Sequence, residues 1–205
     1  MTQTNVPDIV IRRLTTYLQT LKHMAELGKT VASSAEIGRW TGVSPAQFRK
    51  DLSYFGEFGR QGLGYDVGFL RDQIERILKS DQDWHIVLVG AGALGHALMN
   101  YQAFQEGHFQ IVAVFDNDPS KIGTFVGQRE ILPLERLAAV IAERHIDIAI
   151  LAVPAAAAQQ TADSLVACGV RSLLSYAPIT ITVPRGVHVR YIDPVASLQT
   201  MTYYL

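Results

Sequence analysis

Three glycines near the middle of the chain have the spacing of a dinucleotide-binding turn. They fall in a GxGxxG pattern that directly follows the apolar segment 86–89. In such a turn the first glycine makes a tight bend, the second lets the backbone approach a pyrophosphate, and the third lets the next helix pack on the strand. Backbone N–H groups and the positive dipole at the start of that helix favour phosphate binding. The residues predicted to bind the ligand here are Gly90, Ala91, Gly92, Ala93, Leu94 and Gly95.

A carboxylate after the next apolar segment completes the pattern. Residues 94–104 are expected to form a helix and residues 111–115 a second strand, with Asp116 at its end. A carboxylate at this position can accept hydrogen bonds from both hydroxyls of an adenosine ribose. This carboxylate would repel a 2′-phosphate, and no arginine follows it directly to bind one. The pattern therefore favours NADH/NAD⁺ over the phosphorylated dinucleotides.

Residues 81–192 alternate between strand and helix patterns. This alternation predicts an α/β fold, a Rossmann-like doubly wound parallel sheet, which binds its ligand at the carboxyl ends of the strands. Val153 and Pro154, together with segment 176–178, are therefore expected near the nicotinamide half of the ligand. The other predicted elements are helices 134–144 and 155–167 and strands 146–153, 171–175 and 187–192.

The first 80 residues predict a winged-helix DNA-binding domain. A helix is expected to start near Pro7 and to end at Gly28. Segments 33–36 and 44–47 each have the serine and the Glu/Gln of a capping box, so two more helices begin there. Gly42, in the turn between them, can adopt a left-handed conformation. Two helices joined by such a turn form the helix-turn-helix, whose second helix enters the major groove of double-stranded DNA.

Polar side chains on the second of these helices are the candidates for DNA contact. Arginine and lysine can donate to guanine or phosphate, and glutamine can pair with adenine. The glycine-rich segment 55–67 predicts a β-hairpin wing from which Arg60 would reach a minor groove. The alternative without DNA binding is a helical accessory domain in which Arg49 and Lys50 form a solvated face. The predicted DNA contacts are Ser44, Gln47, Arg49, Lys50, Ser53, Tyr54 and Arg60.

Composition supports a globular intracellular protein. Hydrophobic residues make up 48% and charged residues 18% of the 205 residues, enough for a packed core. Residues 1–80 contain eleven Lys/Arg and eight Asp/Glu, a charge of +3, whereas residues 81–205 contain seven and eleven, a charge of −4. We find no apolar run of membrane-spanning length and no signal-peptide pattern, so we expect a cytoplasmic protein without a membrane partner. The single cysteine, Cys168, excludes an intrachain disulfide and a cysteine-based zinc site, and we expect it to be buried.

An enzymatic function is less favoured, because the sequence lacks the expected catalytic groups. Hydride transfer to a carbonyl usually needs a proton donor beside the nicotinamide. No Tyr-x-x-x-Lys pair occurs. Four of the histidines are expected in the first helix or just before strands, away from the carboxyl ends of the strands, and we interpret His96 as helix surface and His188, in the final strand, as structural. One alternative is a small NAD-dependent oxidoreductase with a helical accessory domain. The other is a CoA-binding protein, because the strand end at 153–154 and the alanine-rich helix after it also occur in CoA-binding domains. The histidines are His23, His85, His96, His108, His145 and His188.

Nearly the whole chain resembles the Rex family of bacterial redox-sensing transcriptional repressors. The most diagnostic match is the run from Arg49 to Gly56, which continues through segment 62–65. The glycine fingerprint matches on to Tyr101, which the resemblance adds to the ligand-binding residues. The other matching segments are 12–18, 115–119 and 192–205.

This resemblance implies a homodimer in which each C-terminal helix, residues 193–205, is exchanged onto the partner. Val195, Leu198, Met201 and Leu205 fit this independently, because they line one face of a helix that has little of its own domain left to cover. The resemblance also implies that NAD⁺ is compatible with DNA binding, whereas NADH closes the dimer and releases operator DNA. No metal is expected.

Three positions depart from the family pattern. Ala93 stands where the family commonly has asparagine in the fingerprint. Gln19 stands where several members have an arginine that pairs with the aspartate matching Asp193, and Pro194 where some members have an aromatic residue. Which residues set the switch in this chain is therefore left open.

Overall fold

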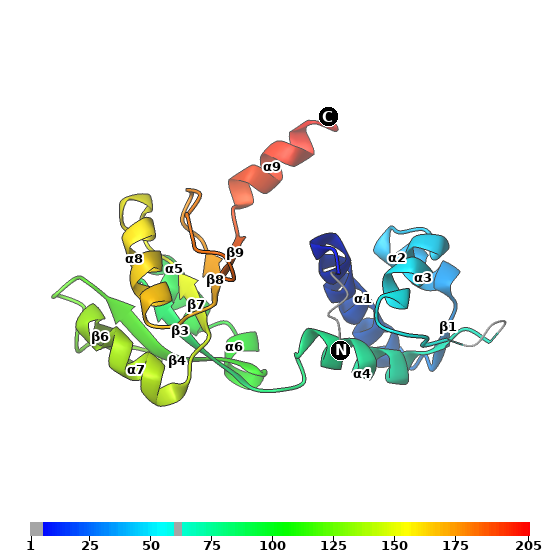
Figure 1. The fold of residues 1–205 in the computed structure, drawn as a ribbon, viewed down its shortest axis with the longest axis horizontal. Helices are drawn as coiled ribbons and strands as arrows, with labels where there is room; N and C mark the ends of the chain where they lie inside the picture. Colours follow the sequence, from blue (N-terminus) through cyan, green and yellow to red (C-terminus); the bar gives the residue numbers. More distant parts are fainter. Residues whose placement is uncertain (1–5, 60–62) are drawn as a thin grey trace. The chain divides into compact units, whose positions relative to one another are not determined.

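The computed structural model describes residues 6–59 and 63–205, and the contacts within it divide the chain into two units. The first unit ends at Gln82 and the second begins at Asp83 (Figure 1), close to the predicted boundary at residues 80 and 81. Within the described residues, no helix is both long enough and apolar enough to span a membrane.

The described part of the first unit contains four helices and a two-stranded antiparallel sheet. Tyr17, Phe48 and Leu70, from three different helices, are fully buried in its core, and the rings of Tyr17 and Phe48 meet edge to face at 4.9 Å. The elements are α1 (Asp8–Glu26), β1 (Val31–Ala32), α2 (Ser34–Thr41), α3 (Pro45–Ser53), β2 (Tyr65–Asp66) and α4 (Val67–Leu78).

The predicted helix-turn-helix is confirmed, and local chemistry accounts for it. The Ser33 side chain accepts a hydrogen bond from the Glu36 backbone N–H, and that of Ser44 accepts one from the Gln47 N–H at 3.1 Å. Gly42 ends α2 with a φ of +73°, which costs glycine little. Both helices therefore begin at their serine caps, and α2 ends at Gly42.

The predicted wing is wrong in its strand pairing. Residues 56–59 form no strand, and β2 pairs with β1 instead, with Val31 opposite Asp66. Gly64 permits this approach, because a Cβ there would lie 2.8 Å from the Ala32 carbonyl oxygen. The predicted minor-groove residue Arg60 lies outside the described residues.

The second unit is built on a seven-stranded sheet in the order β5-β6-β4-β3-β7-β8-β9. Every pairing is parallel except that of β5 with β6. Alternate residues of β3 belong to different apolar clusters, one on each face of the sheet, which confirms the doubly wound prediction. The strands are β3 (Trp84–Val89), β4 (Phe109–Asp116), β5 (Phe125–Val126), β6 (Arg129–Pro133), β7 (Ile148–Leu151), β8 (Ser172–Ser175) and β9 (His188–Tyr191).

The helices of this unit depart from the prediction in two places. The expected helix 94–104 is broken into two after Met99, where the side chains of Asn100 and Gln105 donate to the carbonyls of His96 and Met99. The expected helix 134–144 begins with a 3₁₀ turn, η1 (Leu134–Arg136). The α-helices are α5 (Ala93–Met99), α6 (Ala103–Glu106), α7 (Leu137–Arg144), α8 (Ala155–Ala167) and α9 (Pro194–Thr202).

The structure differs from the sequence prediction in two more respects. Strands β5 and β6 were not predicted, and Cys168 is partly rather than fully buried. Helix α9 buries none of its residues within the chain.

Candidate functional site

A cavity of about 640 Å³ opens at the carboxyl ends of β3, β4 and β7, where a doubly wound sheet binds its ligand. Seven of the ten predicted ligand-binding residues line it: Gly90, Gly92, Ala93, Leu94, Asp116, Val153 and Pro154. The cavity is also lined by Tyr176, from the segment expected near the nicotinamide.

The three fingerprint glycines meet different surroundings, as the spacing predicts. Gly90 has a φ of +106°, and a Cβ there would lie 2.3 Å from the Ala152 carbonyl oxygen. A Cβ at Gly95 would lie 2.1 Å from the Gly90 carbonyl oxygen, so helix α5 can pack this closely only without a side chain. A Cβ at Gly92 would meet no atom within 4 Å. The open space beside Gly92 is where a pyrophosphate would approach the backbone.

Asp116 braces this turn from the end of the neighbouring strand. Asp116 is only 6% exposed, and its carboxylate accepts hydrogen bonds from the backbone N–H groups of Ala91 at 2.8 Å and Asp118 at 2.9 Å, and from Lys121 Nζ at 3.1 Å. Burial opposes the charged form, but these hydrogen bonds outweigh it, so the pKa of Asp116 lies below its usual value. The residue predicted to bind ribose thus also holds the phosphate turn in shape.

Several residues that line the cavity were not predicted from the sequence. Lys121 reaches both Asp116 and, at 3.7 Å, Asp118, and the only available signal was a lysine five residues after the acid. Thr161 is contributed by α8, which no local motif marks. The other unpredicted lining residues are Val89, Asn117, Asp118, Leu134, Ala152, Ala156 and Ala157.

The structure does not bring every predicted residue to the cavity. Ala91 and Gly95 are buried behind the turn. Tyr101 is 59% exposed, and its ring lies against Phe104 at 5.8 Å. Its place is beyond the carboxyl end of α5, whereas the phosphate turn is at the amino end. The expected role of Tyr101 in ligand binding therefore has no support in the geometry of this cavity.

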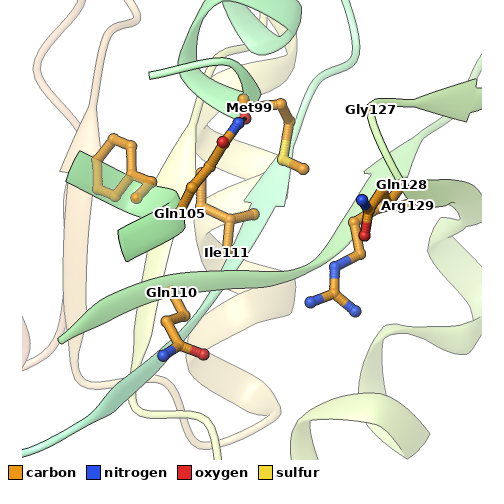
Figure 2. A pocket seen from close by; sticks show the side chains of 8 residues that line it. Met99, Gln105, Gln110, Ile111, Gly127, Gln128 and Arg129 are labelled. Carbon is orange, nitrogen blue, oxygen red and sulfur yellow. Dashed lines mark hydrogen bonds between the residues drawn. The ribbon is translucent and has the colours of Figure 1, made fainter. Parts of the chain in front are cut away.

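A second cavity, of about 540 Å³, shares no lining residue with the first. Gln110 and Ile111 line it from the start of β4, and Arg129 from the start of β6, so it lies toward the opposite ends of the strands (Figure 2). Its described lining contains neither the fingerprint turn nor a carboxylate. The dinucleotide-binding pattern therefore belongs to the first cavity alone.

Helix α3 presents only some of the predicted DNA contacts to solvent. Arg49, Lys50 and Ser53 are exposed, and Arg49 Nη1 donates to the Ser34 hydroxyl at 2.9 Å. Tyr54 and Gln47 are half-buried. The predicted Ser44 is the exposed N-cap, whose hydroxyl already accepts the Gln47 N–H.

Metal-binding chemistry finds no support in the described part of the chain, where no group of three or more His, Cys, Asp and Glu side chains is placed to hold an ion.

Comparison with known proteins places both units together in one family. Residues 5–53 match a family described as "Putative DNA-binding protein N-terminus", and residues 81–179 one described as "CoA binding domain". A "Redox-sensing transcriptional repressor Rex" from Chloroflexus aggregans is 53% identical, over 97% of this chain and 94% of the relative. The chain belongs to the Rex family. A Rex from Brevibacillus brevis is 42% identical, over 98% of this chain and 97% of the relative.

Solved Rex structures agree with this assignment over both units. The crystal structure of RSP in complex with β-NAD⁺ and operator DNA is 36% identical, with a TM-score of 0.92, and the match covers 98% of this chain and 93% of that one. The structure of RSP in complex with β-NADH is 34% identical, with a TM-score of 0.89, covering 98% and 94%. The CoA-binding family match, residues 81–179, falls within the part of the chain that both structures cover.

The lowered pKa of Asp116 predicts how acid acts on the second unit. A carboxylate whose folded pKa is depressed contributes stability above its unfolded pKa, and loses that contribution as pH falls through the folded pKa. We therefore expect Asp116→Asn to lower the free energy of unfolding at pH 7 and to make its decline toward about pH 4 shallower than in the wild type. Denaturant unfolding at several pH values measures both, with Asp163→Asn, an exposed acid on α8, as the control. Wild-type stability of Asp116→Asn at every pH would show that the hydrogen bonds to Asp116 do not hold the turn.

Proposed function

We propose that this chain is a transcriptional repressor that senses the NADH/NAD⁺ ratio. The second unit would bind the dinucleotide, and the first would bind double-stranded operator DNA. The observation that carries the proposal is one chain with both a helix-turn-helix and a glycine-lined cavity that ends at a buried, ionised Asp116. The redox-sensing repressors it resembles from end to end support the same function.

In the cavity, each wall suits a different part of the dinucleotide. The backbone around Gly92 would bind the pyrophosphate, and Asp116 the adenosine ribose. Lys121 Nζ lies beside Asp116, so a ribose hydroxyl would share the carboxylate with this ammonium group or displace it. Val153, Pro154 and Tyr176 would face the nicotinamide, whereas Tyr101 remains a candidate through family resemblance alone. None of the six histidines is among the described lining residues, which favours a sensor over an oxidoreductase.

On the first unit, α3 would lie in the major groove. Arg49, Lys50 and Ser53 are the exposed side chains that would contact base edges or phosphates. Ser44 and Tyr54 would contact the backbone from the two ends of the helix, and Arg60 is proposed for the minor groove. The charge of +3 on residues 1–80 favours the approach of this unit to DNA.

Control of DNA binding by the nucleotide requires that the ligand bind two states of the protein unequally. NADH would bind the form that releases DNA better than the form that holds it, and NAD⁺ would not discriminate against the DNA-bound form. A repressor has to reach chromosomal DNA, so we propose that this protein is located in the cytoplasm.

A homodimer would provide the two states. On α9 the side chains of Val195, Leu198 and Met201 are each about 60% exposed. Asp193 starts the helix by accepting the Val195 and Ala196 N–H groups, so the helix forms without a packing partner in its own chain. We propose that the second copy covers this apolar face, through exchange of residues 193–205.

Substitution of Gly92 tests the nucleotide site. We expect Gly92→Ala to keep wild-type thermal stability, because the new Cβ meets no protein atom, yet to weaken NADH binding by about tenfold or more, because the methyl group occupies the path of the pyrophosphate. NADH fluorescence titration and thermal melting measure the two effects. Gly95→Ala is the contrasting variant, since its Cβ would clash with the Gly90 carbonyl and should lower stability. Unchanged NADH affinity in Gly92→Ala would exclude this cavity as the site.

Removal of one cation tests the DNA surface. Lys50→Ala should weaken DNA binding and reduce the slope of log K against log salt by about one, because one phosphate contact is lost. NADH affinity should stay unchanged. Fluorescence anisotropy on labelled promoter DNA measures the first effect, and Lys22→Ala, on α1, is the matched control. Equal DNA binding by Lys50→Ala and the wild type would remove Lys50 from the interface.

A charge on the apolar face of α9 tests the dimer. Leu198→Glu should convert a dimer into monomers, because the new carboxylate would have to be buried between copies. Thr200→Glu, on the opposite side of the same helix, should leave the dimer intact. Light scattering during gel filtration gives the mass of each variant. A dimeric Leu198→Glu variant would show that α9 does not hold the copies together.

A further inference from the structure

Asp51 is a fully buried carboxylate on the helix that we propose to enter DNA. Its exposure is 0%, although it lies between Lys50 and Ser53, which face solvent. It has no part in the DNA contacts proposed above. A buried charge is costly unless it is fully hydrogen-bonded, so its surroundings must compensate it.

Four hydrogen bonds compensate Asp51, two on each oxygen. Arg13, from α1, donates through Nε to Oδ2 at 2.5 Å and through Nη2 to Oδ1 at 2.8 Å. The Tyr17 hydroxyl, also on α1, donates to Oδ2 at 2.7 Å. Gln47 Nε2, one turn earlier on α3, donates to Oδ1 at 2.7 Å. The cluster therefore joins α3 to α1, and two of its side chains, Arg13 and Gln47, are partly exposed.

The carboxylate is ionised at neutral pH. Burial raises the pKa of Asp51, but the hydrogen bonds from Arg13, Tyr17 and Gln47 lower it further than burial raises it. Burial and the hydrogen bond to Asp51 raise the pKa of Tyr17, which keeps its hydroxyl a donor. An ionised carboxylate only accepts hydrogen bonds, so every group that faces Asp51 has to donate.

This requirement fixes the orientation of the Gln47 carboxamide. Its nitrogen must face Asp51, which leaves the Oε1 acceptor and one N–H for another partner. Gln47 is half-buried and lies in the amino-terminal part of α3, which is the part of a recognition helix that contacts base edges. An acceptor beside a donor matches the N6 amino group and N7 of adenine in the major groove.

We propose that Asp51 is a positioning residue that fixes the Gln47 carboxamide for reading one adenine of the operator. The proposal rests on the DNA-binding function proposed above. Arg13 and Tyr17 hold the carboxylate, the carboxylate holds the amide, and the amide contacts the base. Asp51 itself stays away from DNA.

The test compares base preferences rather than affinity alone. Anisotropy would be measured on promoter DNA bound by the wild type, on a scrambled duplex, and on a panel with single A·T pairs replaced by G·C. One replacement in the site should cost the wild type about tenfold in affinity through the lost adenine contact. In Asp51→Asn and Gln47→Ala that cost should disappear, while the costs at other positions remain. Asp72→Asn, the same change on a partly exposed acid of α4 that pairs with Arg71, should behave as wild type.

The outcomes separate this inference from the function it rests on. If the wild type fails to distinguish promoter DNA from the scrambled duplex, the proposed function fails. If it does distinguish them, and Asp51→Asn retains the full cost at every position or loses affinity for all sequences equally, Asp51 has no role in base reading. Gln47→Ala leaves the carboxylate and Arg13 in place, so it tests the adenine contact even where Asp51→Asn does not fold. Rapid solvent exchange of both Gln47 Nε2 protons in the wild type would overturn the fixed orientation.

Discussion

The hydrogen bond from the Ala91 N–H to Asp116 joins the ends of two neighbouring strands, and the geometry of the nucleotide cavity depends on it. The turn after β3 has to present backbone to a ligand, and glycines alone leave such a turn free to move. Asp116, held at the end of β4 by the parallel sheet, fixes the turn from the side. Because its carboxylate also lines the cavity, ribose binding would act on the same group that shapes the phosphate turn.

Each unit uses a buried carboxylate in this way. Asp51 in the first unit and Asp116 in the second are both kept ionised by donated hydrogen bonds in spite of burial. A buried anion that can only accept dictates which atoms of its neighbours face it. It thereby orients groups beside it: under the proposals above, the Gln47 amide would face a base and the backbone after Gly90 a phosphate.

The sequence predicted those parts that local chemistry determines. Serine caps, the turn at Gly42 and the glycine fingerprint act within a few residues, and the structure has them as expected. Contacts between distant segments could not be read in the same way. The pairing of β2 with β1 joins residues more than thirty positions apart, and two-residue strands such as β5 have no periodicity. Asp51 escaped notice because a polar residue on a recognition helix suggests exposure, and only its contact with α1 shows that it faces inward.

Coupling between the two units is the central claim, and a single titration tests it most directly. Labelled DNA from the promoter region would be bound by the full chain and titrated with NADH and, separately, with NAD⁺, while anisotropy reports the bound fraction. The account predicts that NADH releases the DNA at concentrations at which NAD⁺ does not. Tight DNA binding that neither nucleotide changes would contradict it, since the cavity in the second unit would then have no influence on the helix in the first.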